Sequence, residues 1–319
     1  MNVAVEEHNV EIDGLPIRYL TAGEGPPMVL LHGAGDNALD WQWIMPTLAA
    51  THQVYAPDLP GSPDSARPAA DYSPAFFERF VAAFVDALDI GRATFVGNSL
   101  GGLLALRLAL SEPARVDALV LVDSAGLGRA VNPAFTSVNV PLLGEAAIPF
   151  WRTAVGAYQR AWGRTALLFA HPPGSVPREW LAEQCRLARS PGYLEAHLTA
   201  LRTLVSPLGQ REVLVNRLGL LEMPTLVVWG NATGCSRGPR PSGRPPASGK
   251  VRSPSSPSVA TCPTSSAPTA SWRPSTDSSS GGCTVDRWRR EETRGYLGEL
   301  FFSGAEDYGR TRLMAGPAG

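Results

Sequence analysis

The chain has 319 residues, of which 44% are hydrophobic, and a formal net charge of -1 at pH 7. That length fits one large α/β domain or two smaller ones, and the balanced charge lacks the basic surface that a nucleic-acid partner requires. No apolar run reaches the roughly 18 residues of a membrane span, so a membrane partner is not expected either.

The first residues, "MNVAVEEHNVEIDG", are acidic and contain no apolar core of a secretion signal. We therefore expect a cytoplasmic protein. Its four cysteines, Cys185, Cys235, Cys262 and Cys283, lack the close CxxC spacing of a zinc site. The sequence accordingly predicts no disulfide framework, no metal and no cofactor.

Short apolar runs alternate with amphipathic segments along the chain. A hairpin with an Asp-Gly turn is predicted over 10–20. Helices are predicted over 73–91, where Ser73 is a suitable N-cap, and over 99–113. Further strands are predicted over 27–33, 52–61, 93–97, 116–123 and 224–230. Repeated strand-helix units predict an α/β fold with a doubly wound, mostly parallel sheet whose sites lie at the carboxyl ends of the strands.

The strand pattern stops between Gly126 and about Ser206, where aromatic-rich helical segments take over. We expect a helical insertion that covers the sheet as a cap. The predicted division is a core over 1–125, a helical cap over 126–206, the core continued over 207–230, and an atypical tail over 231–319. Residues 231–290 contain no Leu, Ile, Met, Phe or Tyr, so this stretch cannot bury enough apolar surface to offset the entropy of ordering it, and we expect it to be irregular.

The stretch "FVGNSLGG" places Gly97-x-Ser99-x-Gly101 between a predicted strand and a predicted helix. A sharp turn there exposes the serine hydroxyl at the top of the sheet, and the helix N-terminus favours developing negative charge. The bare motif is weak evidence, but its flanking strand and helix make it specific. Ser99 is therefore the candidate nucleophile; the alternative is a glycine-rich turn with a solvated serine.

A second glycine-rich loop, "LLHGAGDN", follows an earlier strand. Its residues His32, Gly33 and Gly35 leave backbone N–H groups uncovered, so the N–H of Ala34 is predicted to pair with that of Leu100 as an oxyanion hole. The alternative is a plain tight turn after a strand.

Three further residues have open roles. Asn98 is expected either to orient substrate or to satisfy local backbone groups. Trp41 and Trp43 are candidates for lining a pocket, although buried aromatic residues more often belong to a core.

Residues 10–230 resemble the α/β-hydrolase family, in the branch whose helical cap follows the sixth strand. The matching stretches are "LLHGAG", "PDLPG", "FVGNSLGG", "LVLVDSAG" and "PTLVVWG". The resemblance implies a carboxylesterase, a lactonase or a carbon-carbon hydrolase of aromatic ring-cleavage products; the last group often carries Asn where Asn98 stands. Serine at 99 argues against the dehalogenase and epoxide hydrolase relatives, which use Asp there.

The family's order of catalytic residues is Ser, then Asp or Glu, then His. Neither the Asp that normally follows "VVWG" nor the later Gly-His is present, and no histidine occurs after His197. A serine without a base is a poor nucleophile at neutral pH. Asp123 is a candidate acid, with His171 or His197 as base, but these histidines fall in the predicted cap and Asp123 is more simply explained as fixing a loop. No catalytic histidine is identified.

A shifted reading frame explains the missing residues. The chain has one lysine, Lys250, among 28 basic Lys and Arg residues, which indicates a GC-rich gene. With one base restored near Gly230, back-translated residues 231–235 re-read as Glu-Arg-Asp-Arg-Leu, and 259–272 re-read with a Gly-His pair. These match the family's acid and histidine loops in one frame. First bases are free choices, so each single match is weak, and the alternative is a native disordered Ser/Pro/Arg tail.

Two functions remain from the sequence. The first is a serine hydrolase acting on a small ester, lactone or related carbonyl compound, impaired by the missing acid and histidine. The second is a catalytically inactive binding protein or frameshifted product. In either case the partner is a small molecule, and the oligomeric state is not predicted. We also expect the strand over 224–230 to lie at an open, aggregation-prone sheet edge.

Overall fold

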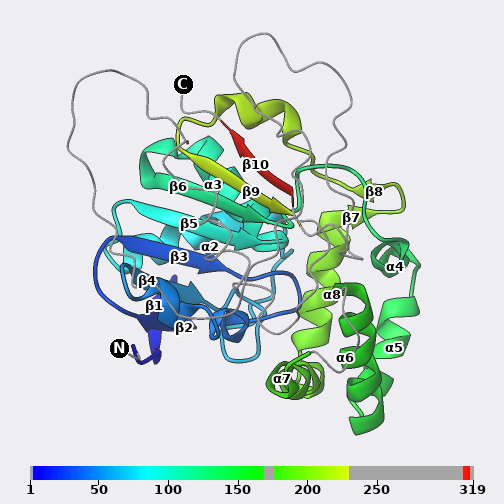
Figure 1. Ribbon diagram of the computed structural model, residues 1–319. Coiled ribbons are helices and arrows are strands. Elements are labelled where there is room, and N and C mark those ends of the chain that lie inside the picture. The colour runs from blue at the N-terminus through cyan, green and yellow to red at the C-terminus, as the bar shows by residue number, and fades with distance from the viewer. Residues whose placement is uncertain (1–2, 169–175, 230–311, 317–319) are drawn as a thin grey trace, which may run out of the picture.

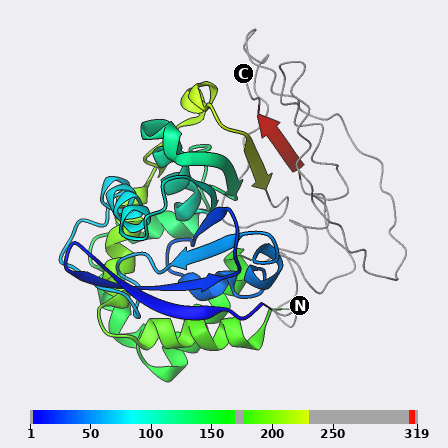
Figure 2. The same ribbon diagram turned by 90° about the vertical axis from the view of Figure 1, so that its left-hand side faces the viewer.

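A computed structural model describes residues 3–168, 176–229 and 312–316 of the chain (Figure 1). In these ranges, a sheet of 8 strands has the order β1-β2-β4-β3-β5-β6-β9-β10. The strands are β1 (Glu6–Ile12), β2 (Leu15–Ala22), β3 (Pro27–Leu31), β4 (Gln53–Pro57), β5 (Ala93–Asn98), β6 (Val116–Val122), β9 (Thr225–Trp229) and β10 (Arg312–Gly316). Figure 2 shows the β1–β2 hairpin and the β9–β10 pair at opposite edges of the sheet.

The centre of the sheet is parallel. Strand β3 pairs in parallel with β4 and β5, β5 with β6, and β6 with β9. The hairpin of β1 and β2 is antiparallel, and its turn residues Asp13 and Gly14 have φ values of 51° and 76°, as the tight hairpin turn of an Asp-Gly pair requires. The predicted α/β class with a mostly parallel sheet is confirmed.

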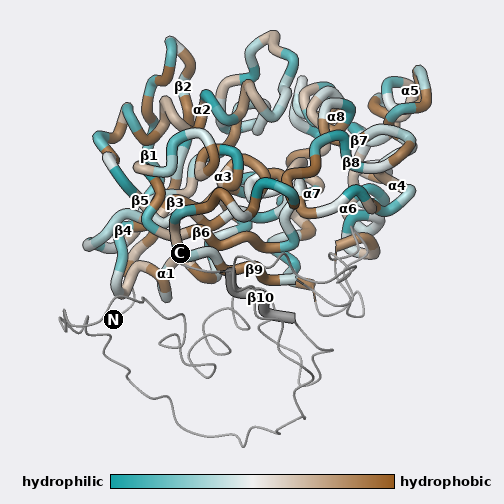
Figure 3. The backbone as a smooth tube through the Cα atoms, turned by 90° about the horizontal axis from the view of Figure 1, so that it is seen from above, coloured by the Kyte–Doolittle hydropathy of each residue, from teal (hydrophilic) through white to brown (hydrophobic). Residues whose placement is uncertain are grey.

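The central strands are buried on both faces, as their continuous apolar runs predict. In β3, Val29 and Leu31 belong to the hydrophobic cluster that contains helices α2 (Pro74–Ala87) and α3 (Leu100–Ser111), whereas Met28 and Leu30 belong to a second cluster. This second cluster contains the 3-10 helix η1 (Ala38–Trp41) and helix α1 (Met45–Leu48). Alternation along the strand thus assigns successive side chains to opposite layers, and hydrophobic residues concentrate along the central strands in Figure 3.

Helix α2 forms for the reasons that its sequence indicates. The hydroxyl of Ser73 accepts a hydrogen bond from the Phe76 N–H at 3.2 Å, and Pro74 occupies the first turn, where its missing N–H costs nothing. Its buried residues recur at helical spacing: Phe77, Phe80, Val81, Phe84 and Val85.

Among the described residues, five α-helices lie between β6 and β9 in the chain, and Figure 1 shows them gathered at one end of the sheet. They are α4 (Pro133–Thr136), α5 (Leu143–Trp151), α6 (Ala154–Leu168), α7 (Arg178–Arg189) and α8 (Tyr193–Leu204), followed by the short strands β7 (Val205–Ser206) and β8 (Gly209–Gln210) and the 3-10 helix η5 (Val215–Leu220). We call α4–α8 the inserted helices. They have a hydrophobic cluster of their own, which includes Ile148, Leu187 and Tyr193.

The edge of the sheet differs from the prediction at β9. Strand β10 pairs antiparallel with β9 over its whole length, from Trp229 opposite Arg312 to Thr225 opposite Gly316. The expectation of an open edge at β9 is therefore wrong for the described residues. The rest of the predicted irregular tail over 231–319 lies outside them.

Candidate functional site

Ser99 occupies a sharp turn between β5 and α3. Its backbone angles are φ 50° and ψ -111°, and such a conformation costs a non-glycine residue on the order of 1–3 kcal/mol. Its N–H donates to the Val122 carbonyl at 3.0 Å. Its carbonyl accepts from the N–H groups of Leu103 and Ala125 at 3.1 and 2.9 Å. The fold thus holds the strained residue in place, and its side chain is half-buried.

Two glycines beside Ser99 permit this turn. A Cβ at Gly97 would lie 2.3 Å from the carbonyl oxygen of Gly101, and a Cβ at Gly101 would lie 2.0 Å from the carbonyl oxygen of Leu31. A side chain does not fit at these separations, so β5, α3 and β3 pack this closely only where side chains are absent. The glycines of the motif are therefore a packing requirement.

The loop after β3 is fixed by His32. This histidine is 3% exposed; its Nε2 accepts from the Leu59 N–H at 2.9 Å, and its Nδ1 lies 2.8 Å from the Gly33 carbonyl. Because Nε2 is an acceptor, we assign the proton to Nδ1, which donates to Gly33. Burial lowers the pKa of His32, so the ring is neutral and structural.

The loop lies directly against the nucleophile turn. A Cβ at Gly33 would be 2.8 Å from Asn98 Oδ1 and 3.4 Å from Ser99 Cβ. Ala34 and Leu100, the two residues predicted to supply the oxyanion N–H groups, line one cavity of about 30 Å³, whereas Ser99 stands beside it. One water needs about 10–15 Å³ of such space, so the cavity has room for about two waters.

The cavity lies where the carboxyl ends of β3, β4 and β5 meet. Residues after each of these strands line it, and helix α8 closes it through Tyr193, Ala196, His197 and Ala200. This is the location that a parallel α/β sheet favours for a ligand site. His197, which the sequence offered as an alternative base, is therefore across the cavity from the two predicted oxyanion donors.

Asn98 and Asp123 lie on the neighbouring strand ends. Asn98 Nδ2 donates to the Val122 carbonyl at 3.3 Å, which is the local backbone role. Asp123 has a φ of 42°, and its N–H donates to the Val228 carbonyl at 2.9 Å. Asp123 is not among the residues that line the cavity.

A buried ion pair joins the loop after β3 to the inserted helices. Asp36 Oδ1 accepts from Arg164 on α6 at 2.5 Å and from Gln184 Nε2 on α7 at 2.9 Å. Asp36 and Arg164 are 7% and 8% exposed, so water screens their attraction little. Burial alone would lower the pKa of Arg164, but the charge of Asp36, together with Tyr193, Asp40 and the hydrogen bond to Asp36, raises this pKa overall.

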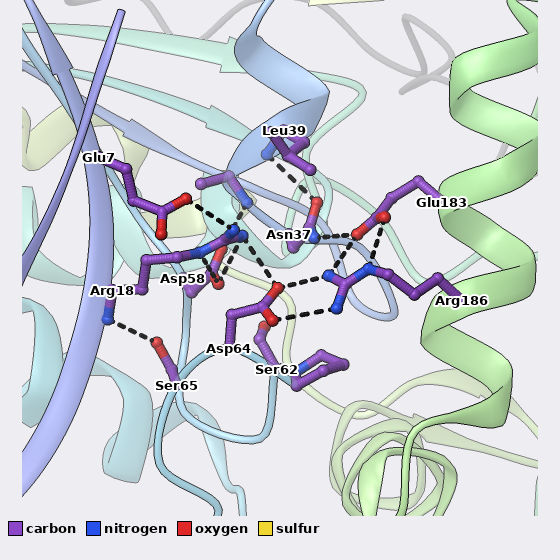
Figure 4. A network of polar contacts seen from close by, with 12 residues as sticks. Glu7, Arg18, Asn37, Leu39, Asp58, Ser62, Asp64, Ser65, Glu183 and Arg186 are labelled. Atoms are coloured by element: carbon purple, nitrogen blue, oxygen red, sulfur yellow. Dashed lines mark hydrogen bonds and ion pairs between the residues drawn. The ribbon is translucent and has the colours of Figure 1, made fainter.

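A second polar network extends from the buried Arg18–Asp58 pair to helix α7 (Figure 4). Arg18 on β2 donates to Asp58 at 2.9 Å, and Asp58 accepts from the Ala38 N–H at 2.7 Å. Arg186 on α7 donates to Asp64 at 3.0 Å. Burial alone would raise the pKa of Asp64, but the hydrogen bond from Arg186 and the charge of Arg18 lower it overall.

The wall of the cavity formed by helix α8 carries one buried polar atom, His197 Nδ1, that lacks a hydrogen-bond partner among the described residues. Burial, followed by the positive charges of Arg160 and Arg164, holds the pKa of His197 well below its ordinary value. His197 is therefore neutral near pH 7.

The other candidates predicted from the sequence do not contribute to the cavity or lie outside the described residues. Trp41 is 2% exposed and belongs to the hydrophobic core, and Trp43 is 43% exposed; neither lines the cavity. His171 lies outside the described residues. Within the described ranges, no cluster of three or more His, Cys, Asp or Glu residues is suited to a metal ion, and no helix combines the length and apolar character needed to cross a membrane.

A family model for the alpha/beta hydrolase fold matches residues 26–235. The chain belongs to the alpha/beta hydrolase fold family. An uncharacterized protein of Mycobacterium tuberculosis is 34% identical to the chain over 230 residues. The matched region covers 69% of the chain and 65% of the relative. The match thus spans less than two thirds of that relative's own length.

Two other similarities concern proteins with named activities. The chain is 39% identical over 129 residues to 2-hydroxymuconate semialdehyde hydrolase of a Pseudomonas species. These residues cover 39% of the chain and 46% of that enzyme. The crystal structure of a serine hydrolase involved in carbazole degradation, the CarC enzyme, aligns with a TM-score of 0.54 at 26% identity, over 72% of this chain and 80% of that one. The chain is therefore a hydrolase by lineage.

Sequence reasoning missed the polar residues of the inserted helices. Arg160 and Arg164 are one turn apart on α6, a spacing that by itself indicates a solvated helix face. The apolar residues that flank these arginines in the sequence of α6 are a sign of burial. Only the contact of Arg164 with Asp36 shows that this face of α6 is buried. Asp36 lies in "HGAGDN", where the loop sequence alone does not indicate its distant partner on α6.

Proposed function

We propose that the chain has the catalytic site of a serine hydrolase that acts on a small ester, lactone or related carbonyl compound. Ser99 Oγ attacks the carbonyl carbon, the π electrons move onto the carbonyl oxygen, and the N–H groups of Ala34 and Leu100 bind the resulting oxyanion. The observation that carries this proposal is the strained backbone of Ser99 beside a loop whose Ala34 shares a cavity with Leu100.

In this proposal the inserted helices act as a cap. The domain division of core over 1–125, cap over 126–206, core over 207–230 and tail over 231–319 rests on their place between β6 and β9 and on their own hydrophobic cluster. Helix α8 covers the cavity, so the cap shapes the space for the acyl or alcohol part of the substrate.

The general base is the least supported part of the proposed catalytic site. Attack by Ser99 releases a proton that needs an acceptor, and the family's later Asp and His are absent from the sequence. We propose that activity is impaired for this reason. His197 is neutral and faces the cavity, but it projects from a cap helix, and Asp123 does not line that cavity. The geometry therefore gives little support to a substitute pair.

A second function is favoured by the same absence. A chain that keeps the cavity and lacks the base would be a catalytically inactive binding protein or a frameshifted product, with a frame change near Gly230. The relatives include a 2-hydroxymuconate semialdehyde hydrolase, and both ester and carbon-carbon bond substrates stay open for the parent activity. A cytoplasmic location remains part of the proposal.

The test compares p-nitrophenyl butyrate hydrolysis by this chain and by a version in which the segment after Gly230 is re-read with one base restored. We expect the restored chain to be faster by about 1,000-fold or more, since loss of triad residues costs at least that much. Ser99→Ala should abolish the activity of the restored chain. Equal rates from both chains, or full activity without Ser99, would refute the proposal.

Reading the gene around Gly230 is the accompanying measurement. A lost base in the run of G that encodes Trp229 and Gly230 supports the frame change. An uninterrupted frame there, found in independently cloned DNA, leaves the inactive binding protein as the better proposal.

A further inference from the structure

Helix α5 presents apolar side chains to water as well as to the hydrophobic cluster of the inserted helices. Ile148 is buried in that cluster, whereas Leu143 and Phe150 are exposed. Residues 130–151 contain a single charged residue, Glu145. A surface helix ordinarily turns polar residues toward water. An exposed apolar face of this kind therefore marks an interaction surface.

Leu142, immediately before α5, is unfavourable in two respects. Its side chain is 74% exposed, and its φ of 62° lies in the left-handed region, which disfavours a leucine. A glycine or an asparagine would relieve both the backbone strain and the exposure of apolar surface. Folding stability does not account for a leucine at this position, and a strained residue of this kind points to a functional role.

A groove of about 420 Å³ adjoins the same part of the molecule. It lies between residues 129–136 and the turn of the β7–β8 hairpin, where Leu208 is exposed. The Gln210 N–H donates to the Arg129 carbonyl at 2.9 Å, so the two walls are held together. Figure 1 shows β8, α4 and α5 following one another along the side of the inserted helices away from the sheet. The groove and the apolar face of α5 therefore belong to one outer surface.

Two arginines of this surface have no acidic partner. Arg129 lines the groove and Arg211 follows the hairpin, and both are exposed. Neither forms an ion pair with a carboxylate in the part of the chain that the structure describes. Glu145 is already paired with Arg202. The surface thus combines exposed apolar side chains with unpaired positive charge.

We propose that this outer surface, which consists of the exposed residues of 129–150 together with Leu208 and Arg211, binds peripherally to an anionic phospholipid membrane. The apolar side chains enter the boundary between headgroups and acyl chains, and the arginines lie at the level of the lipid phosphates. The lack of an apolar run of spanning length excludes a membrane span but not binding to the membrane surface. The cytoplasmic leaflet carries anionic lipids, which agrees with the proposed cytoplasmic location.

The distribution of charge favours a lipid surface over a second copy of the chain. In a two-fold dimer the same surface meets itself, so Arg129 and Arg211 of both copies would enter one interface. Glu145 cannot neutralise them, because Arg202 already pairs with it. Lipid phosphates supply the negative charge that a second copy lacks.

Co-sedimentation of the full-length chain with vesicles tests the surface. Vesicles of equal parts phosphatidylglycerol and phosphatidylcholine are compared with phosphatidylcholine alone, and a sample without vesicles gives the background. We expect binding to the anionic vesicles to be about tenfold or more tighter, since each arginine contributes about fivefold. Arg129→Gln should weaken that binding about fivefold. The matched control Arg178→Gln, at an exposed arginine of α7, should bind like the parent chain.

Leu142→Asn separates binding from folding. Asparagine tolerates the left-handed backbone, so the thermal midpoint without lipid should be unchanged or higher. Affinity for the anionic vesicles should fall about tenfold or more, as the loss of an inserted leucine side chain requires. The matched control Leu220→Asn, at a leucine of η5 that is 64% exposed, should leave the affinity unchanged.

Equal affinity for the two kinds of vesicle, no sedimentation above background, or anionic binding that survives Leu142→Asn would each overturn the proposal. Light scattering that shows a dimer for the parent chain and a monomer for Leu142→Asn would also overturn it, because the surface would then belong to a second copy. Ser99→Ala should bind vesicles like the parent chain, so a failure of the proposed catalysis is recognised separately.

Discussion

The two walls of the cavity differ in how completely their polar groups are paired. On the sheet side, both ring nitrogens of His32 have backbone partners, and the backbone of Ser99 is held by three hydrogen bonds. On the side of the inserted helices, His197 Nδ1 is buried without a partner among the described residues. The polar groups of the sheet wall are therefore more completely paired than those of the helical wall.

This difference separates chemistry from recognition. The strained turn and the loop beside it belong to the parallel sheet, whose packing leaves no freedom at Gly97 and Gly101. The helical wall is attached by the Asp36–Arg164 ion pair and by surface contacts such as Arg186–Asp64. A change of ligand preference is therefore possible on the helices without disturbing the turn.

The largest expected effect is at the glycines of the turn. Gly101→Ala would place a Cβ 2.0 Å from the Leu31 carbonyl oxygen, so the free energy of unfolding should fall by about 4 kcal/mol or more. The control is Gly163→Ala on α6, where an added Cβ meets nothing within 4 Å; it should raise that free energy by about 0.5–1 kcal/mol. Urea unfolding measures both. Similar, small effects at the two positions would show that the turn is not tightly packed.

The next effect concerns the buried pair that attaches the helical wall. Asp36→Asn leaves the Arg164 guanidinium buried without its counter-charge, so the free energy of unfolding should fall by about 3–5 kcal/mol. The Arg152–Glu195 pair, whose side chains are 36% and 50% exposed, is the solvated comparison, and Glu195→Gln should cost about 0–1 kcal/mol. If Asp36→Asn were no worse than Glu195→Gln in urea unfolding, the pair would not be the attachment.

The smallest effect is a pH dependence on the helical wall. The pKa of His197 is held well below its ordinary 6.5, so the unfolded chain binds a proton in a pH range where the folded chain does not. Stability from the neutral ring is present above about pH 6.5 and is lost as the pH falls toward the lowered pKa. His197→Gln should reduce this loss, measured as urea midpoints between pH 7.5 and 5. Because burial also lowers the pKa of His32, only the difference between the two proteins is diagnostic, and parallel curves would contradict the assignment.

Much of the sheet wall was predictable because local rules decide it. The Gly-x-Ser-x-Gly turn, the Ser73 cap and the alternation of Val29 and Leu31 with their neighbours follow from backbone sterics and strand periodicity, which short stretches of sequence contain. The loop of His32 and Ala34 shares a cavity with Leu100 of the turn, as expected where parallel strands bring their carboxyl ends together.

The helical wall and the sheet edge depend on contacts between distant residues. Arg160 as a whole residue is half-buried and its Nη1 is buried, and nothing in α6 alone distinguishes this from a solvated arginine. Asp36 meets Arg164 across 128 positions of the chain. Strand β10 pairs with β9 although the intervening sequence contains no strand pattern of its own, so the edge could not be inferred from Thr225–Trp229.

The nucleophile assignment is tested most directly by the crystal structure of the chain with its reading frame restored after Gly230, treated with diethyl p-nitrophenyl phosphate, because the chain as written lacks the base that activates Ser99. The account predicts a phosphoryl group bonded to Ser99 Oγ, with its oxygen about 2.7–3.1 Å from the amide nitrogens of both Ala34 and Leu100. An adduct on another residue, or a Ser99 adduct whose oxygen turns away from these two nitrogens, would contradict it.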